Sequence, residues 1–89
     1  MRGARFSRAT DVPNTKGMDM ARVSRVRRMF RNGRARRLRE QSALSVRELA
    51  GMVGVDPSTL SRWERGETTP GVAGARAWVS AMERLGMRL

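Results

Sequence analysis

Serine and arginine side chains are spaced between residues 57 and 65 so that they would share one face of a helix. The four that fall within an arc of roughly 100°, at about 100° per residue, are Ser58, Ser61, Arg62 and Arg65. Hydroxyl and guanidinium groups side by side can donate hydrogen bonds to phosphate oxygens or to the edge of guanine. This face therefore suits the binding of a polyanion better than the making or breaking of covalent bonds.

The residue types that most enzymes and metal sites need are missing, because the 89 residues include no Cys and no His. Thiolate nucleophiles, Cys/His zinc sites and imidazole catalysis are therefore excluded, and the carboxylates are too scattered to form a catalytic pair. We expect neither enzymatic activity nor a cofactor or metal. No run approaches the roughly 20 apolar residues of a membrane span, and no apolar stretch of a secretory signal follows the N-terminus, so we expect a cytoplasmic protein.

The basic residues are distributed unevenly along the chain. Lys and Arg number 19 against 8 Asp and Glu, and residues 1–39 contain 13 of the basic residues but only 2 acidic ones. A polycationic arm before an electrically balanced globular part favours a polyanionic partner. All basic residues except Lys16 are Arg, which suits bidentate contacts to phosphate or guanine, although an arginine-rich genome would give the same bias.

The arm has two parts. Residues 1–18 mix Gly, Pro, Asn, Ser and Thr with scattered Arg and lack apolar periodicity, which predicts disorder in the unbound state. A solubilising tail or an extension from an upstream start site, with Met18 or Met20 as the alternative start, would look the same.

Residues 19–32 are the second part, in which apolar residues recur at three- and four-residue steps between arginines. Val23, Val26, Met29 and Phe30 form this stripe, which predicts a basic amphipathic helix that is capped at Asp19. The stripe could dock on the globular core, pair with another subunit, or fold only on nucleic acid. The arginines expected to contact nucleic acid are Arg22, Arg25, Arg27, Arg28, Arg31 and Arg34.

Local signals define the helices that follow. We predict the first of these helices over residues 34–42. Ser45 and Glu48 form a capping box, which predicts that the second helix starts at residue 46. Gly54 follows this helix, at a position where a helix C-terminus often needs a left-handed backbone conformation. Asp56 and Pro57 then supply an N-cap and a first helical residue. Two helices joined by so short a turn must cross at a steep angle, which is the helix-turn-helix shape.

The sequence also predicts which residues of these helices face inward. Leu60, Trp63 and Glu64 fall opposite the polar face of the helix over 57–65. We predict a further helical stretch that starts at Thr69 and Pro70, is broken near residues 71–74 and ends at Gly86. Its inward-facing residues would be Trp78, Met82 and Leu85. Both tryptophans lie in apolar stripes, so we expect them to anchor the core and not to stack on a ligand.

The segment from Leu38 to Pro70 resembles the Cro/repressor-type helix-turn-helix family, also called the XRE family. The matching residues are Leu38-Arg39-Glu40, Leu44-Ser45, Glu48-Leu49-Ala50, Gly54-Val55, Ser58 through Gly66, and Pro70. The resemblance extends over residues 34–86. It implies an all-α, compact five-helix lambda-repressor-like domain at 33–89, preceded by a disordered basic arm at 1–18 and a basic amphipathic helix or arm at 19–32.

The resemblance also implies roles for individual residues. The helix over 57–65 would enter the DNA major groove, with Pro57, Ser58, Thr59 and Arg62 facing the bases. Phosphate contacts are expected from Arg47, Ser61, Arg65, Thr68 and Thr69. Glu64 would pair with Arg39, since an unpaired carboxylate on the inner face would cost several kcal/mol. The chain departs from the family at Val46, where a phosphate-binding Gln is common.

The function implied is a sequence-specific transcriptional repressor of phage or bacterial type that binds a palindromic operator as a homodimer. The dimer surface would be the last helix around residues 78–89, or else the stripe over 23–30. An antitoxin with the same DNA-binding domain, using residues 19–30 to neutralise a toxin, is one alternative. Nonspecific nucleic-acid binding by the arm alone is another.

Overall fold

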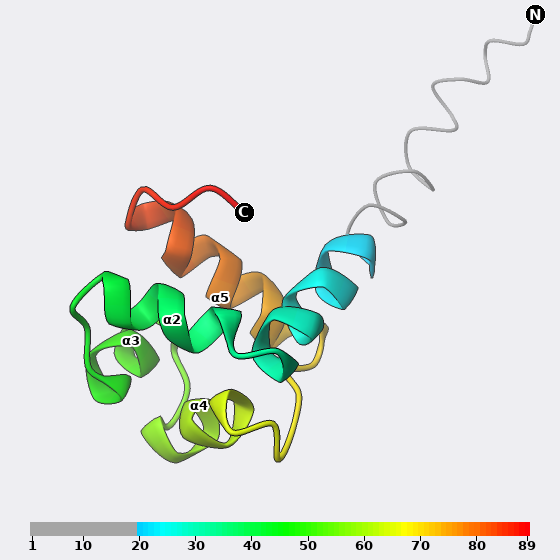
Figure 1. The fold of residues 1–89 in the computed structure, drawn as a ribbon, viewed down its shortest axis with the longest axis horizontal. Coiled ribbons are helices and arrows are strands. Elements are labelled where there is room, and N and C mark those ends of the chain that lie inside the picture. Colours follow the sequence, from blue (N-terminus) through cyan, green and yellow to red (C-terminus); the bar gives the residue numbers. More distant parts are fainter. Residues whose placement is uncertain (1–19) are drawn as a thin grey trace, which may run out of the picture.

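Helices make up most of residues 20–89, which are the residues that the computed structural model describes. Residues 20–31 are helical, and four further helices follow: α2 (Arg34–Gln41), α3 (Val46–Val53), α4 (Pro57–Glu64) and α5 (Val72–Arg84). Figure 1 shows α2 across the middle of the molecule, with α4 below it and the C-terminal segment above it. These residues contain no strand, which confirms the expected all-α, five-helix fold. The arm predicted at 1–18 lies outside them.

The capping box predicted before α3 is present. The Ser45 hydroxyl accepts a hydrogen bond from the Glu48 N–H at 3.0 Å, and the Glu48 carboxylate accepts one from the Ser45 N–H at 2.8 Å. The hydrogen bond from the Ser45 backbone, followed by the one with its side chain, holds the pKa of Glu48 below its usual range. At the other end Gly54 adopts a φ of 89°, a left-handed conformation that glycine reaches without a steric penalty.

The start of α4 differs from the prediction in one respect. Asp56 occupies the N-cap position, and its carbonyl oxygen accepts hydrogen bonds from the N–H groups of Thr59 and Leu60, but its side chain makes no capping hydrogen bond. Pro57 therefore carries the start signal, because its fixed φ suits the first helical residue. The helix ends at Glu64, one residue before the predicted end.

The predicted start and break of the last helix were wrong. The helix begins at Val72, not at Thr69 and Pro70, and α5 then continues without a break to Arg84, with Gly74 inside it. A Cβ at Gly74 would lie 2.8 Å from Cη2 of Trp63, too close for two carbon atoms. The missing side chain therefore allows α5 to approach α4, and it does not mark a break.

The helix over residues 20–31 is part of the core. Its stripe of Val23, Val26, Met29 and Phe30 is buried, and the Phe30 ring lies 5.6 Å from Trp63 and 5.1 Å from Trp78 between centroids. Of the roles left open by the sequence, docking on the chain's own core is therefore the one that the structure shows. The stripe is not available as a dimer surface, and both tryptophans are core anchors, as predicted.

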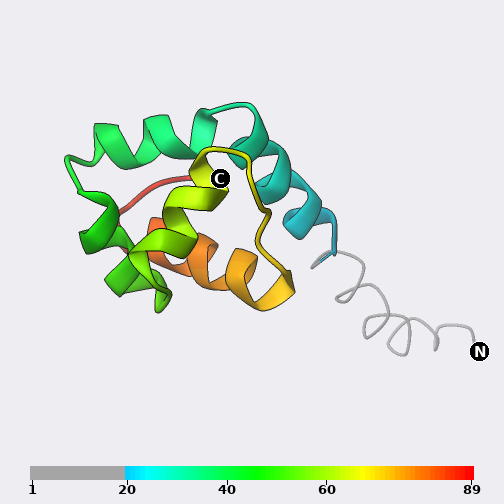
Figure 2. The same ribbon diagram turned by 90° about the horizontal axis from the view of Figure 1, so that it is seen from below.

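The arrangement of the helices leaves α4 on the outside. α3 packs against both α4 and α5, and Figure 2, seen from below, places α4 in front of the other helices. Leu60 and Trp63 turn inward, at 0% and 6% exposure. Within residues 20–89, no helix combines the length and the apolar character that crossing a bilayer demands.

Candidate nucleic-acid interface

The outer face of α4 presents the side chains that the sequence singled out as base-reading. Ser58 and Arg62 are exposed, and Pro57 and Thr59 are half-buried. None of the hydrogen bonds or ion pairs within residues 20–89 involves the Arg62 side chain. Its guanidinium group therefore keeps all of its N–H donors for a ligand.

Two expected phosphate-binding residues, Ser61 and Arg65, are already bonded to each other. The Arg65 guanidinium donates to the Ser61 hydroxyl, and it also forms an ion pair with Glu67, with Nε at 2.7 Å from Oε2. The hydrogen bond from Arg65 lowers the pKa of Glu67, and the same bond raises the pKa of Arg65. A phosphate bound here would compete with the Glu67 carboxylate for Arg65, a contact that the sequence did not predict.

A buried ion pair supports this face from behind. Arg39 donates from Nε and Nη2 to the two carboxylate oxygens of Glu64, at 2.8 and 2.9 Å, and from Nη1 to the Leu44 carbonyl at 2.8 Å. The side chains are only 11% and 5% exposed. The hydrogen bond to Glu64 raises the pKa of Arg39. The pair expected from the resemblance is present, and it ties α2 to α4 and to the start of α3.

A hollow of about 250 Å³ lies where α2, α3 and α4 meet. Its lining side chains are Arg36, Arg39, Val46, Ser61, Glu64 and Arg65. Val46 contributes an apolar wall, so it offers no donor in place of the family's Gln. Three arginines line the hollow next to the first turn of α3, each of them ion-paired, to Glu40, Glu64 or Glu67. The size of the hollow suits a phosphate group.

Arg36 is a candidate that the sequence analysis missed. It lines the hollow from α2, and it forms an exposed ion pair with Glu40 at 3.1 Å. The signal was available in the spacing, because residues three apart on a helix are neighbours and Arg39, three residues later, was expected to face Glu64.

The remaining phosphate candidates are accessible. Arg47 lies in the first turn of α3, and Thr68 and Thr69 lie in the turn after α4; all three are exposed. The first turn of α3 also presents the positive end of the helix dipole, which favours anions.

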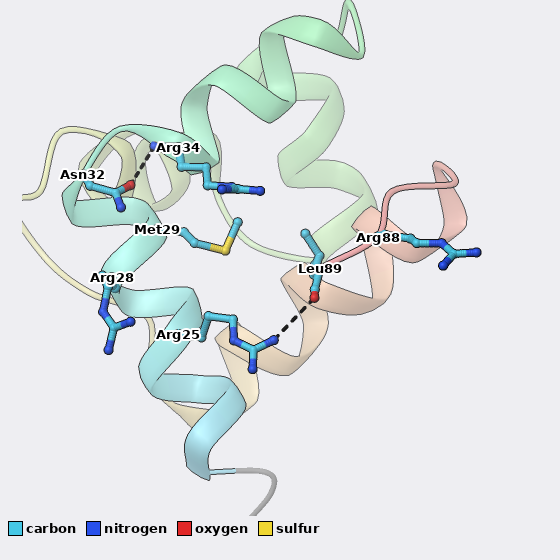
Figure 3. Close-up of a pocket in the computed structure, with 7 residues that line it drawn as sticks. All are labelled: Arg25, Arg28, Met29, Asn32, Arg34, Arg88 and Leu89. Atoms are coloured by element: carbon cyan, nitrogen blue, oxygen red, sulfur yellow. Dashed lines mark hydrogen bonds between the residues drawn. The ribbon is translucent and has the colours of Figure 1, made fainter.

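The structure does not bring the expected arm contacts to α4. Arg25, Arg28 and Arg34 line a separate hollow together with the C-terminal residues (Figure 3), on the other side of α2 from α4. Arg22 and Arg31 are exposed. Arg27 is half-buried and donates from Nε to the Pro70 carbonyl at 2.9 Å, so it fastens the N-terminal helix to the turn before α5.

Comparison with known proteins adds one finding. A family model described as helix-turn-helix (HTH_3) matches residues 36–84, a segment that contains α3, α4 and α5 and nearly all of α2. No curated protein and no solved structure matches the chain.

Proposed function

This chain belongs to the HTH_3 helix-turn-helix family of the XRE/Cro/C1 type, which binds DNA, and on that premise we propose that it is a sequence-specific transcriptional repressor. The observation that carries the proposal is the exposed face of α4, where the Arg62 side chain makes no hydrogen bond or ion pair within the described residues. An α-helix fits the major groove, where each base pair presents a distinct pattern of donors and acceptors.

In the proposed complex Arg62 reads a guanine. Its guanidinium group can donate two hydrogen bonds to O6 and N7 of that base, whereas the Ser58 hydroxyl can pair with several bases and discriminates less. Pro57 and Thr59 offer apolar contacts, of the kind that a thymine methyl group accepts. Their half-buried positions at the start of α4 support this role.

Phosphate groups would position α4 on the duplex. The hollow between α2, α3 and α4 offers Arg36, Ser61 and Arg65 to one phosphate. Arg47, Thr68 and Thr69 are exposed for others. Contacts of this kind fix the register of a protein on DNA but carry no sequence information directly.

A single α4 reads only a few base pairs, so we propose that two copies bind a palindromic operator. In a two-fold symmetric complex the two recognition helices lie about 34 Å apart, one turn of DNA. Trp78 and Met82 are buried in the chain's own core, so they are not available to a partner, and a dimer contact at this end of the chain would use the exposed face of α5 and the residues after it. The antitoxin alternative loses its expected toxin-binding stripe, because that stripe is buried as well.

Selection of bound duplexes from a random DNA library tests this function. We expect a palindromic consensus whose half-sites are about 10 base pairs apart, centre to centre. An enriched pool without any consensus would contradict sequence-specific binding and would favour nonspecific binding through the arginines.

A further inference from the structure

A second basic surface lies on the side of α2 that faces away from α4. Its largest hollow, about 330 Å³, is lined by Arg25, Arg28, Arg34 and Arg88 (Figure 3). A smaller hollow shares Arg25 with it, and another shares Arg34. We call the continuous surface that they form the arginine strip, and its members are Arg22, Arg25, Arg28, Arg34, Arg37 and Arg88.

The strip is largely without counter-charges. The ion pairs of Arg36, Arg39 and Arg65 lie on the other side of α2. Glu83 is the one acidic side chain that lines any of the three hollows. The single side-chain hydrogen bond of the strip, from Arg25 to the Leu89 carbonyl, is long at 3.4 Å. Six like charges gathered in this way attract a polyanion.

The geometry of α2 separates this strip from the α4 surface. Residues two positions apart on a helix point about 200° apart around its axis. Arg39 points to Glu64 on α4, so Arg37 points away from α4, and Arg34 is related to Arg36 in the same way. Figure 1 agrees, because α2 lies between α4 and the C-terminal segment that borders the strip.

We propose that the arginine strip binds the phosphate backbone of a second DNA duplex, so that one protein bridges two duplex segments. Arginine binds phosphate with two parallel hydrogen bonds.

Other occupants fit the surface less well. The large hydrophobic side chains exposed within residues 20–89 are Met20 and Val72, neither of which lines the strip. The apolar side chains that do line its hollows, such as Met29, Val79 and Leu89, are buried or half-buried, so the strip offers a partner protein little apolar surface. Phe30, Trp63 and Trp78 are buried, which leaves the described surface without an aromatic platform for single-stranded bases. A uniformly charged duplex backbone needs neither feature.

The test is a two-duplex capture experiment with the full chain. The protein is bound to a duplex that carries the selected consensus on beads, and a dye-labelled random-sequence duplex is added at about 0.15 M salt. One variant carries R28Q, R34Q and R88Q, three exposed side chains without a hydrogen bond or ion pair within residues 20–89. The matched variant carries R47Q, R62Q and R65Q and loses the same charge from the α4 side.

We expect the wild-type protein to retain the labelled duplex. The strip variant should bind the bead duplex with unchanged base preference and retain at least about tenfold less labelled duplex. Because each phosphate contact contributes about 0.9 to the slope of log K against log salt, the slope for the labelled duplex should fall by up to about 2.7. Equal retention by the strip variant would overturn the proposal, because the two α4 surfaces of a dimer would then hold both duplexes.

Two further outcomes separate this proposal from the proposed function on which the bridging rests. If labelled poly-glutamate is retained in a strip-dependent way and the labelled duplex is not, the strip binds an acidic protein, and the proposal is overturned. If the matched variant keeps all of its preference for the consensus while the wild-type protein still retains the labelled duplex, base reading by α4 is contradicted. Duplex binding by the strip is not contradicted by this result.

Discussion

Arg39 and Arg62 show how the same side chain takes different roles in different surroundings. Arg39 is 11% exposed and gives all of its described hydrogen bonds to Glu64 and Leu44. Arg62 is exposed and has no hydrogen bond or ion pair within residues 20–89. The first is a structural cation that orients α4, and the second is free to bind a ligand.

Removal of Arg39 should destabilise the fold severely. Arg39→Ala leaves the Glu64 carboxylate, which is 5% exposed, without its partner, and a broken buried pair costs about 3 to 5 kcal/mol. The free energy of unfolding from urea titration measures this loss. The double variant Arg39→Met with Glu64→Leu should recover most of it, because no charge is then left buried. A loss below about 1 kcal/mol in Arg39→Ala would mean that the pair is as weak as an exposed one.

At the scale of the helix, the local signals of α3 were read correctly from the sequence, whereas Thr69 and Pro70 do not start the last helix. Of the contacts between helices, the Arg39–Glu64 pair was expected and others were not. The bounds of α3 match the prediction because its capping box and Gly54 act locally. The apparent break at Gly74 was wrong because the role of that glycine depends on Trp63, a residue of another helix. Arg36 was missed for a similar reason, since its hollow exists only once α2, α3 and α4 meet.

Two glycine substitutions should change stability in opposite directions. In Gly51→Ala the new Cβ has no atom within 4 Å, so the helix propensity of alanine should stabilise the protein by about 0.5 to 1 kcal/mol. In Gly74→Ala the Cβ meets the buried Trp63 ring at 2.8 Å, and overpacking of about 1 to 3 kcal/mol should exceed that gain. Thermal unfolding of both variants measures the difference. A stabilised Gly74→Ala protein would argue against the close contact of α5 with α4.

The capping box of α3 should make stability depend on pH. The pKa of Glu48 is lowered in the folded state, so its contribution is complete above the unfolded pKa of about 4.3 and is lost as the pH falls through the lower folded value. Urea unfolding of the wild-type protein and of Glu48→Gln from pH 7 to pH 3 checks this. The wild type should lose more stability than the variant below about pH 4. A difference that stays constant over this range would show that the ionised carboxylate contributes nothing at the cap.

At the scale of the whole molecule, the N-terminal helix extends the core beyond the segment that the family model matches. The matched segment begins at residue 36, whereas Val23, Val26, Met29 and Phe30 are buried against the rest of the core. The sequence predicted this helix but left its partner open, because an amphipathic stripe shows that a face is apolar without showing what covers it. Deletions that probe the arm should therefore stop before residue 20.

Phe30→Ala tests this extension of the core. Phe30 is 1% exposed and contacts both tryptophan rings, and truncating a buried phenylalanine costs about 3 to 5 kcal/mol. Met20→Ala is the matched control on the same helix: Met20 is 46% exposed, and its loss should change stability by no more than about 0.5 kcal/mol. Comparable unfolding midpoints for the two variants in urea would argue that the helix is not docked.

The most direct measurement is the affinity of the wild-type protein, Arg62→Ala and Arg84→Ala for the selected consensus and for its single-base-pair variants. Arg84 is an exposed arginine at the end of α5 that donates to the Met52 carbonyl at 2.8 Å. It lies outside the α4 surface, so Arg84→Ala controls for the loss of one charge and of one side-chain hydrogen bond. Arg62→Ala should lose about 1 to 3 kcal/mol of discrimination at one base pair and keep its preferences elsewhere, while Arg84→Ala keeps them all. A uniform loss of affinity across all duplexes in Arg62→Ala would contradict base reading by α4 and would assign Arg62 to a phosphate.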